Sequence, residues 1–150
     1  YADDAALLAD IDSVVATCCA IKARIVEQDE FDTGLRMLLN FGHTLGHAVE
    51  QHFGYSCFTH GEGVAIGMYQ LTKRTEELGM TAKGSAERIK SVLEKYNLPL
   101  TAGVEKAQLL DTMARDKKKN GNSITLIVLQ QIGEGVLQKV DWQEVPKYLG

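Results

Sequence analysis

The stretch GLRMLLNFGHTLGHAVEQHFG, residues 34–54, decides how this chain is interpreted. Its apolar residues recur at helical spacing, which predicts an amphipathic helix over residues 34–53. Successive residues of a helix turn by about 100°, so polar residues spaced 4, 3, 4 and 3 apart fall in one narrow stripe. The stripe consists of Arg36, Asn40, His43, His47 and Glu50.

This stripe is unusual in composition, because solvated helix faces are usually rich in lysine, glutamate and glutamine. Gly42 and Gly46 lie beside the histidines, and each costs about 1 kcal/mol relative to alanine inside a helix. Close approach of a ligand or of a neighbouring backbone would compensate for that cost. The simpler alternative is a surface helix with two chance histidines, as we infer for His52 on the apolar side.

A third histidine follows in FTHGEGVAIGM, residues 58–68, where His60 lies in a glycine-rich loop before the next predicted helix. If the two helices pack as a hairpin, the imidazoles converge on an ion such as zinc. The spacing does not decide whether His43 and His47 both bind, or whether one of them carries a proton. A third protein ligand is needed, either Glu50, Glu62 or a residue outside the chain. Glu62 is better explained as a first-turn acid at a helix N-terminus.

Cationic residues near segment ends form a second candidate group: Lys22, Arg36, Lys117 and Lys118. The run ARDKKKNG, residues 114–121, is typical of a solvated surface. The functional alternative is an anion site, in which lysine binds phosphate as a point charge and arginine binds carboxylate as a fork. Together with the metal, such a site would accept a small, hydroxylated substrate with several negative charges.

The whole chain favours one mainly helical domain, a helical bundle with a small β-hairpin. It has 150 residues, is 45% hydrophobic and carries a net charge of −4, which does not suggest a nucleic-acid partner. No apolar run approaches the roughly 20 residues of a membrane span, and no signal peptide is evident. The expected helices cover residues 3–26, 34–53, 61–78, 83–96, 105–115 and the C-terminal DWQEVPKYLG. The hairpin is expected in SITLIVLQQIG and GVLQKV, residues 123–133 and 135–140.

Two further features limit the class of protein. The cysteines Cys18, Cys19 and Cys57 form no disulfide framework, so we expect them to pack as small hydrophobes in a reducing compartment. The glycines of GEGVAIG follow no strand and lack the G-x-G-x-x-G spacing. The chain therefore has no dinucleotide-binding domain of its own.

The segments GLRMLLNFGHTLGHAVE, THGEGVAIGM and RDKKKNG, the last one before a β-hairpin, together resemble 3-dehydroquinate synthase. The resemblance covers most of the chain but only the C-terminal, helical half of that two-domain fold. It implies one metal- and substrate-binding domain over 1–150, with the N-terminal NAD-binding domain absent from this chain. The family converts 3-deoxy-D-arabino-heptulosonate 7-phosphate to 3-dehydroquinate and phosphate in the shikimate pathway. It uses Zn²⁺ or Co²⁺, and NAD that is reduced and reoxidised within one turnover.

The resemblance also implies roles for single residues. It assigns the metal to His43 and His60, and catalysis to His47 and Lys22. Substrate contacts fall to Arg36, Asn40, Lys117 and Lys118. The third metal ligand of the family is a glutamate from before this sequence, so neither Glu50 nor Glu62 is expected to bind the ion.

The resemblance further implies a cytoplasmic enzyme, homodimeric in its full-length form, that acts on a small phosphorylated sugar acid and binds neither nucleic acid nor membrane. These 150 residues alone are expected to be inactive. The nearest alternative is another sugar-phosphate cyclase, such as a 2-deoxy-scyllo-inosose synthase-like enzyme, against which Arg36 and Lys22 favour a substrate with a carboxylate. More distant alternatives are a metal-dependent polyol dehydrogenase and a non-catalytic helical domain with incidental histidines.

Overall fold

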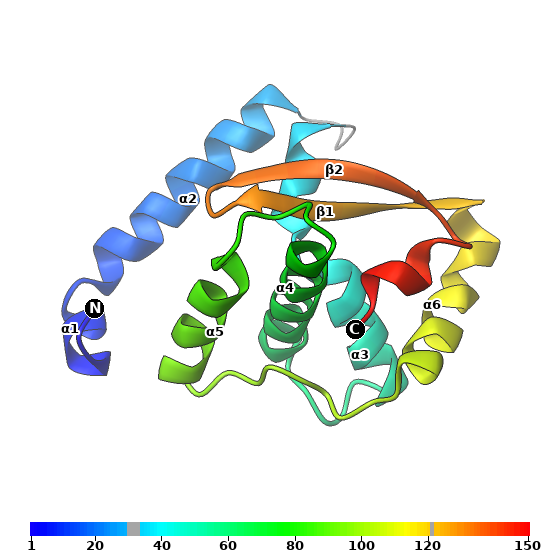
Figure 1. Cartoon of the computed structure of the whole chain (residues 1–150). Coiled ribbons are helices and arrows are strands. Elements are labelled where there is room, and N and C mark those ends of the chain that lie inside the picture. The colour runs from blue at the N-terminus through cyan, green and yellow to red at the C-terminus, as the bar shows by residue number, and fades with distance from the viewer. Residues whose placement is uncertain (30–33, 121) are drawn as a thin grey trace. The chain divides into compact units, whose positions relative to one another are not determined.

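A computed structural model describes residues 1–29, 34–120 and 122–150, without the side chains of 115–120. Mainly helical structure with one antiparallel hairpin confirms the predicted fold class (Figure 1). The chain divides into two compact units, Tyr1–Leu39 and Asn40–Gly150. No helix of the described ranges combines the length and apolar character needed to cross a bilayer.

The first unit contains α1, Asp4–Ala9, and α2, Ile11–Gln28, where the sequence predicted one helix over 3–26. The Asp3 carboxylate accepts a hydrogen bond from the Ala6 N–H at 2.8 Å and starts α1. Asp10 ends it with φ −117° and ψ 12°, outside the helical region, so the prediction of one continuous helix is wrong there.

A 3₁₀ helix, η1, covers Leu35–Asn40 at the boundary between the units. Its start is fixed by Asp29, whose Oδ2 accepts hydrogen bonds from the N–H groups of Gly34 at 2.7 Å and Arg36 at 3.0 Å. These bonds satisfy donors that a helix start leaves unpaired.

The helix predicted over 34–53 is divided at Gly42, so the stripe of five polar residues on one helix is wrong. Gly42 has φ +81° and ψ −16°, a left-handed conformation that glycine adopts without steric cost. It separates η1 from α3, His43–His52. Arg36 and Asn40 therefore belong to η1, whereas His43, His47 and Glu50 remain on one face of α3.

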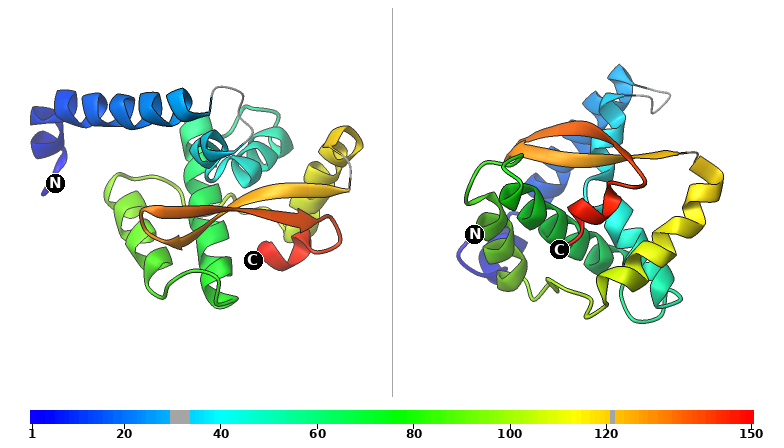
Figure 2. Two further views of the ribbon diagram at one scale, coloured as in Figure 1. Left: turned by 90° about the horizontal axis from the view of Figure 1, so that it is seen from above. Right: turned by 45° about the vertical axis from the view of Figure 1, so that its right-hand side comes forward.

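The second unit is built around α4, His60–Glu77, which packs against both α3 and α5, Ser85–Lys95 (Figure 1). Helix α6, Lys106–Asn120, packs on the other side of α3. The hairpin of β1, Ser123–Gln131, and β2, Glu134–Asp141, crosses α4 and reaches α6 (Figure 2). The 3₁₀ helix η2, Val145–Tyr148, follows and also contacts α4.

The hairpin register pairs Ser123 with Asp141 and Leu129 with Gly135, with an irregularity before Gln131. The core lies between the hairpin and the helices. Its buried apolar residues come from α3, α4, α6, both strands and the C-terminal segment. They include Leu45, Ala48, Leu71, Met113, Leu126, Val128, Val140, Val145 and Leu149. This core holds α3 and α4 in place, and these two helices carry all four histidines.

The cysteines differ from expectation. Cys18, Cys19 and Cys57 are free thiols, and all three are exposed rather than packed as small hydrophobes. The sequence offered no way to see this, because a cysteine at an apolar position of a helical pattern looks the same whether or not another element covers it.

Candidate metal centre

Helix α4 approaches α3 and the residue before it, Gly42, closely through glycines on both sides of the contact. A Cβ atom at Gly67 would lie 2.0 Å from the carbonyl oxygen of Gly42, and one at Gly46 would lie 2.9 Å from the carbonyl carbon of Gly63. The pairings run in opposite directions along the chain, so the helices are antiparallel. The expectation that these glycines make room for a neighbouring backbone is confirmed.

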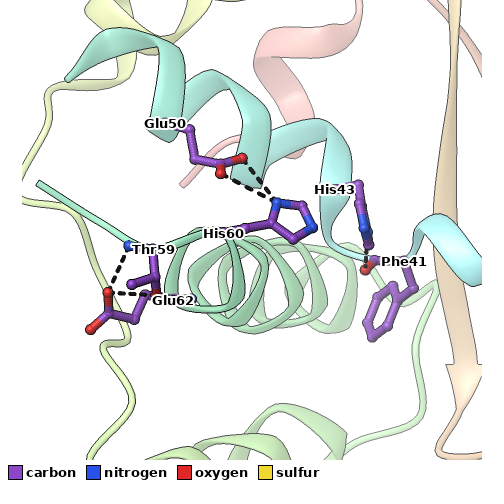
Figure 3. Close-up of polar contacts among 6 residues, drawn as sticks. All are labelled: Phe41, His43, Glu50, Thr59, His60 and Glu62. Carbon is purple, nitrogen blue, oxygen red and sulfur yellow. Dashed lines mark hydrogen bonds and ion pairs between the residues drawn. The ribbon is translucent and has the colours of Figure 1, made fainter. Parts of the chain in front are cut away.

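The start of α4 is fixed by a capping box. The hydroxyl of Thr59 accepts a hydrogen bond from the Glu62 N–H at 3.4 Å, and the Glu62 carboxylate accepts one from the Thr59 N–H at 2.8 Å. The Thr59 backbone and side-chain hydrogen bonds lower the pKa of Glu62. Figure 3 shows the Glu62 carboxylate directed at Thr59 and away from His60. The prediction that Glu62 is a first-turn acid is confirmed.

Three imidazoles lie close together, two from α3 and one from the start of α4. The ring centres of His43 and His60 are 5.0 Å apart, those of His43 and His47 are 5.5 Å apart, and those of His47 and His60 are 5.7 Å apart. A zinc–imidazole bond of about 2.0–2.1 Å puts the ion about 3.2 Å from a ring centre. Two rings at a tetrahedral angle then have centres about 5.2 Å apart. The observed separations fit a shared ion.

Hydrogen bonds orient two of these three rings. His43 Nδ1 lies 3.3 Å from the carbonyl oxygen of Phe41, and His60 Nδ1 lies 3.3 Å from each carboxylate oxygen of Glu50 (Figure 3). Because carbonyl and carboxylate oxygens only accept, a hydrogen bond at either ring requires the proton on Nδ1, and this tautomer would leave the Nε2 lone pair for a metal. Within the described residues, the His47 ring has no such partner. This orientation is compatible with the predicted ligands His43 and His60, and the role of His47 stays a prediction.

A second set of donors is also close together. Ligand atoms of His47, Glu50 and His60 lie within 4.8 Å of one another. Figure 3 shows Glu50 and His43 on opposite sides of the His60 ring, so the two sets would use different nitrogens of His60. The side chain of Glu50 is 8% exposed and that of His60 is 57% exposed. Glu50 is thus the buried partner of an exposed ring, and the predicted set with His43 would use the His60 nitrogen on the side away from Glu50.

The positions of the predicted cations relative to this cluster stay predictions. Lys22 and Arg36 belong to the unit Tyr1–Leu39, and the histidines to the unit Asn40–Gly150, so their proximity stays a prediction. Lys117 and Lys118 lie in the last turns of α6, and their side chains fall outside the described residues. Asn40 ends η1 three residues before His43 and is exposed.

Two residues of the centre were not assigned a role from the sequence. Glu50 was considered only as a metal ligand, although its place two helical turns after His43 could have indicated an orienting carboxylate. The Phe41 carbonyl left no signal, because a backbone acceptor is the same in every residue.

The family described as 3-dehydroquinate synthase C-terminal matches residues 3–119. A 3-dehydroquinate synthase of Clostridium acetobutylicum is 46% identical over 99% of this chain, and one of Enterococcus faecalis V583 is 40% identical over 95%. The chain spans 42% and 40% of those two proteins, respectively.

Solved structures share the fold at lower identity. A 2-deoxy-scyllo-inosose synthase, solved with carbaglucose-6-phosphate, NAD⁺ and Co²⁺, superimposes with a TM-score of 0.75 and 19% identity, over 93% of this chain and 40% of that one. A 2-epi-5-epi-valiolone synthase of Streptomyces hygroscopicus, with NAD⁺ and Zn²⁺ bound, gives a TM-score of 0.68 and 20% identity, over 83% of this chain and 35% of that one. At this identity the likeness establishes the fold.

Proposed function

The chain belongs to the family of 3-dehydroquinate synthase C-terminal domains, and we propose that it is the metal- and substrate-binding part of a 3-dehydroquinate synthase. The complete enzyme would convert 3-deoxy-D-arabino-heptulosonate 7-phosphate to 3-dehydroquinate and phosphate. The observation that carries the proposal is the cluster of three imidazoles with ring centres 5.0–5.7 Å apart, in a chain that is 46% identical over 99% of its length to a protein of that name.

The lengths of the relatives support the division of the enzyme that we propose. The chain spans about two fifths of its curated relatives, and we propose that an N-terminal NAD-binding domain occupies the rest. That part would also supply the third metal ligand, a glutamate. We further propose that the enzyme is cytoplasmic and homodimeric, and that it binds neither nucleic acid nor membrane.

His43 and His60 would hold Zn²⁺ or Co²⁺ through Nε2, because their Nδ1 protons are engaged by Phe41 and Glu50. Imidazole is a ligand that suits both ions. When bound, the ion supplies Lewis-acid polarisation of a substrate hydroxyl and lowers its pKa. The donor set of this chain fits that role, since two imidazoles leave positions open for substrate and for a ligand from elsewhere.

His47 would act as a proton carrier at the substrate. It lies one helical turn after His43, it is exposed, and its ring centre is 5.5 Å from that of His43. A neutral imidazole with one bare nitrogen accepts a proton from a substrate hydroxyl or, once charged, donates to the leaving phosphate oxygen.

The remaining predicted residues would bind the charged ends of the substrate. Arg36 offers a bidentate fork for the carboxylate, and Lys22, Lys117 and Lys118 offer point charges for phosphate. Lys22 is proposed as catalytic as well, since an ammonium beside the reacting oxygens stabilises developing negative charge. Asn40 would hydrogen-bond a substrate hydroxyl.

A related sugar-phosphate cyclase is the second candidate, because the fold is shared with 2-deoxy-scyllo-inosose synthase at a TM-score of 0.75. That likeness has 19% sequence identity, whereas the relatives at 40–46% are named 3-dehydroquinate synthase. We therefore favour the substrate that carries a carboxylate. Comparing turnover of heptulosonate 7-phosphate and glucose 6-phosphate by the full-length protein separates the two.

The proposal is tested with the full-length protein by following phosphate release and 3-dehydroquinate formation. Activity should disappear on removal of metal by a chelator, return with Zn²⁺ or Co²⁺, and proceed without net accumulation of NADH. His43→Ala and His60→Ala should abolish it. His52→Ala is the matched control, because His52 stacks on Phe53 at 5.0 Å and lies outside the three-ring cluster. Full activity of the chelated protein would refute the proposal.

A further inference from the structure

We propose that Glu50 is a positioning residue that fixes the His60 ring for metal binding. Its carboxylate accepts the Nδ1 proton of His60, which holds Nε2 toward the ion shared with His43. Glu50 itself would touch neither the ion nor the substrate. The inference rests on the proposed function, because it assigns Glu50 a role toward the same metal centre.

The geometry of the contact supports this role. Both carboxylate oxygens of Glu50 lie 3.3 Å from His60 Nδ1, so the acceptor faces the ring nitrogen symmetrically. His60 is the first residue of α4 and 57% of its side chain is exposed. Without a partner, such a ring would be free to rotate. A carboxylate that binds the second nitrogen of a metal-ligating histidine fixes both its tautomer and its direction.

The burial of Glu50 is hard to explain by stability. Only 8% of its side chain is exposed, and withdrawing a carboxylate from water is unfavourable unless it is paired. Among the described residues, the one hydrogen-bond partner of that carboxylate is the exposed imidazole of His60. A surface pair with an exposed histidine adds little stability. Placing the acid here therefore has more effect on the direction of the ring than on the fold.

The packing around Glu50 makes space for this arrangement. A Cβ atom at Gly63 would lie 3.2 Å from Glu50 Cγ and 3.6 Å from its Cδ. The glycine that allows α4 to approach α3 thus also admits the Glu50 side chain between them. The carboxylate is constrained on the side opposite His43, as Figure 3 shows, so it reaches Nδ1 of His60 and leaves the other nitrogen facing His43.

The test measures zinc affinity of the full-length protein by competition with a chelator. Loss of an orienting carboxylate typically weakens metal binding about 10–100-fold, and we expect Glu50→Gln to fall in that range. Glu62→Gln is the matched control. It removes the same charge two residues after His60, and glutamine still serves in the capping box, so zinc affinity should not change.

A second measurement can be made on the wild-type protein, so its main result does not depend on how a variant folds. Nitrogen-15 NMR of the metal-free wild-type protein, at a pH where its histidines are neutral, reports which ring nitrogen carries the proton. We expect Nδ1–H at His60, and a mixture of tautomers in Glu50→Gln. The cobalt-substituted protein adds a third readout, because its visible spectrum should keep the same coordination number in Glu50→Gln.

The outcomes separate this inference from the proposed function. If zinc binding is lost in His60→Ala but unchanged in Glu50→Gln, or if wild-type His60 carries its proton on Nε2, the positioning role is overturned and the metal centre stands. If Glu50→Gln changes the cobalt spectrum as His43→Ala does, Glu50 is a ligand and the positioning role is again overturned. A wild-type protein that binds no metal would overturn both.

Discussion

Replacing Gly67 by alanine tests whether the glycine contact between α3 and α4 builds the metal centre. The new Cβ atom would lie 2.0 Å from the carbonyl oxygen of Gly42 and 3.0 Å from the backbone nitrogen of Gly46. Backbone atoms cannot rotate away as a side-chain end can. Carbon and oxygen in contact need about 3.2 Å or more, so the helices must separate by roughly 1 Å.

The energetic balance is unfavourable. Alanine is preferred over glycine inside a helix by about 1 kcal/mol. Overpacking a tight interior costs about 1–3 kcal/mol, and a clash between two backbones belongs at or above the upper end. We therefore expect a net loss of about 2 kcal/mol in the free energy of unfolding. For a chain of this size, that lowers Tm by about 4–8 °C.

We expect Gly67→Ala to weaken zinc binding more severely than it lowers the stability of the fold. Ligand positions in a metal site tolerate about 0.2 Å, so a separation of roughly 1 Å removes His60 from its place opposite His43. We expect zinc affinity to fall at least 10-fold, measured by chelator competition, with Tm measured by circular dichroism on the same samples.

Gly61→Ala is the control for this change, because it lies in the same helix and its Cβ would meet nothing within 4 Å. It should leave zinc affinity unchanged and raise Tm slightly. If Gly67→Ala behaves like Gly61→Ala in both measurements, the contact does not hold the imidazoles together and the reasoning fails.

Further predictions concern single groups of the site and its helix. His47→Ala should lower kcat about 10²–10⁴-fold in the full-length enzyme and leave zinc affinity unchanged, and an equal loss of both would contradict its role as proton carrier. Thr59→Ala should cost about 1 kcal/mol of unfolding free energy in urea titration through loss of the α4 cap, and no change would contradict the capping role. The hydrogen bonds of Thr59 lower the pKa of Glu62 below 4.5, so their stabilisation is complete above pH 4.5 and is lost as the pH falls through the lower folded-state pKa. Thermal unfolding of Glu62→Gln should accordingly depend less on pH in that acid range than the wild type, and identical profiles would contradict this. The 150 residues alone should form no 3-dehydroquinate, and activity of this chain by itself would refute the division of the enzyme.

Much of the fold could be predicted from the sequence, because the spacing of its apolar residues clearly distinguishes helices from strands. The helix predicted over 61–78 is observed as His60–Glu77, and the one over 83–96 as Ser85–Lys95. The hairpin appears where β-branched residues replace the helical period. Helix α4 and the hairpin pack in the core cluster and α5 packs against α4, so local pattern and tertiary structure agree.

The break at Gly42 was not accessible in the same way. A glycine inside a helical pattern is compatible with a continuous helix at a cost of about 1 kcal/mol, and the pattern on both sides of it stays in register. The left-handed conformation of Gly42 goes with its close contact with α4. The Gly42 carbonyl oxygen lies against Gly67, and a Cβ atom at Gly42 would lie 2.6 Å from Met68 Cγ. That contact joins residues 25 positions apart, beyond the reach of any local window.

The break at Gly42 does not affect the prediction that the three imidazoles lie together, because that prediction needs only the part of the helix after residue 42. His43, His47 and Glu50 follow one another at spacings of four and three within α3, so a break before His43 leaves their common face intact. His60 joins them because α4 packs antiparallel to α3. The sequence analysis had made the meeting of the histidines conditional on such a pair of helices. Arg36 and Asn40 lie in η1 rather than on α3, and their proposed contacts with substrate stay predictions.

The exposure of the rings is what a shared catalytic centre requires. A structural zinc site is closed by four protein ligands, whereas a catalytic one keeps a position open for substrate. Here His47 and His60 are exposed, Glu50 is buried next to His60, and the Phe41 carbonyl contacts His43 Nδ1. Buried or backbone groups thus contact Nδ1 of the two proposed metal ligands, His43 and His60, while the His60 side chain stays accessible. Such a half-site can accept a third ligand and a substrate from a second domain without moving its own residues, which would keep the strain of metal binding out of the α3–α4 contact.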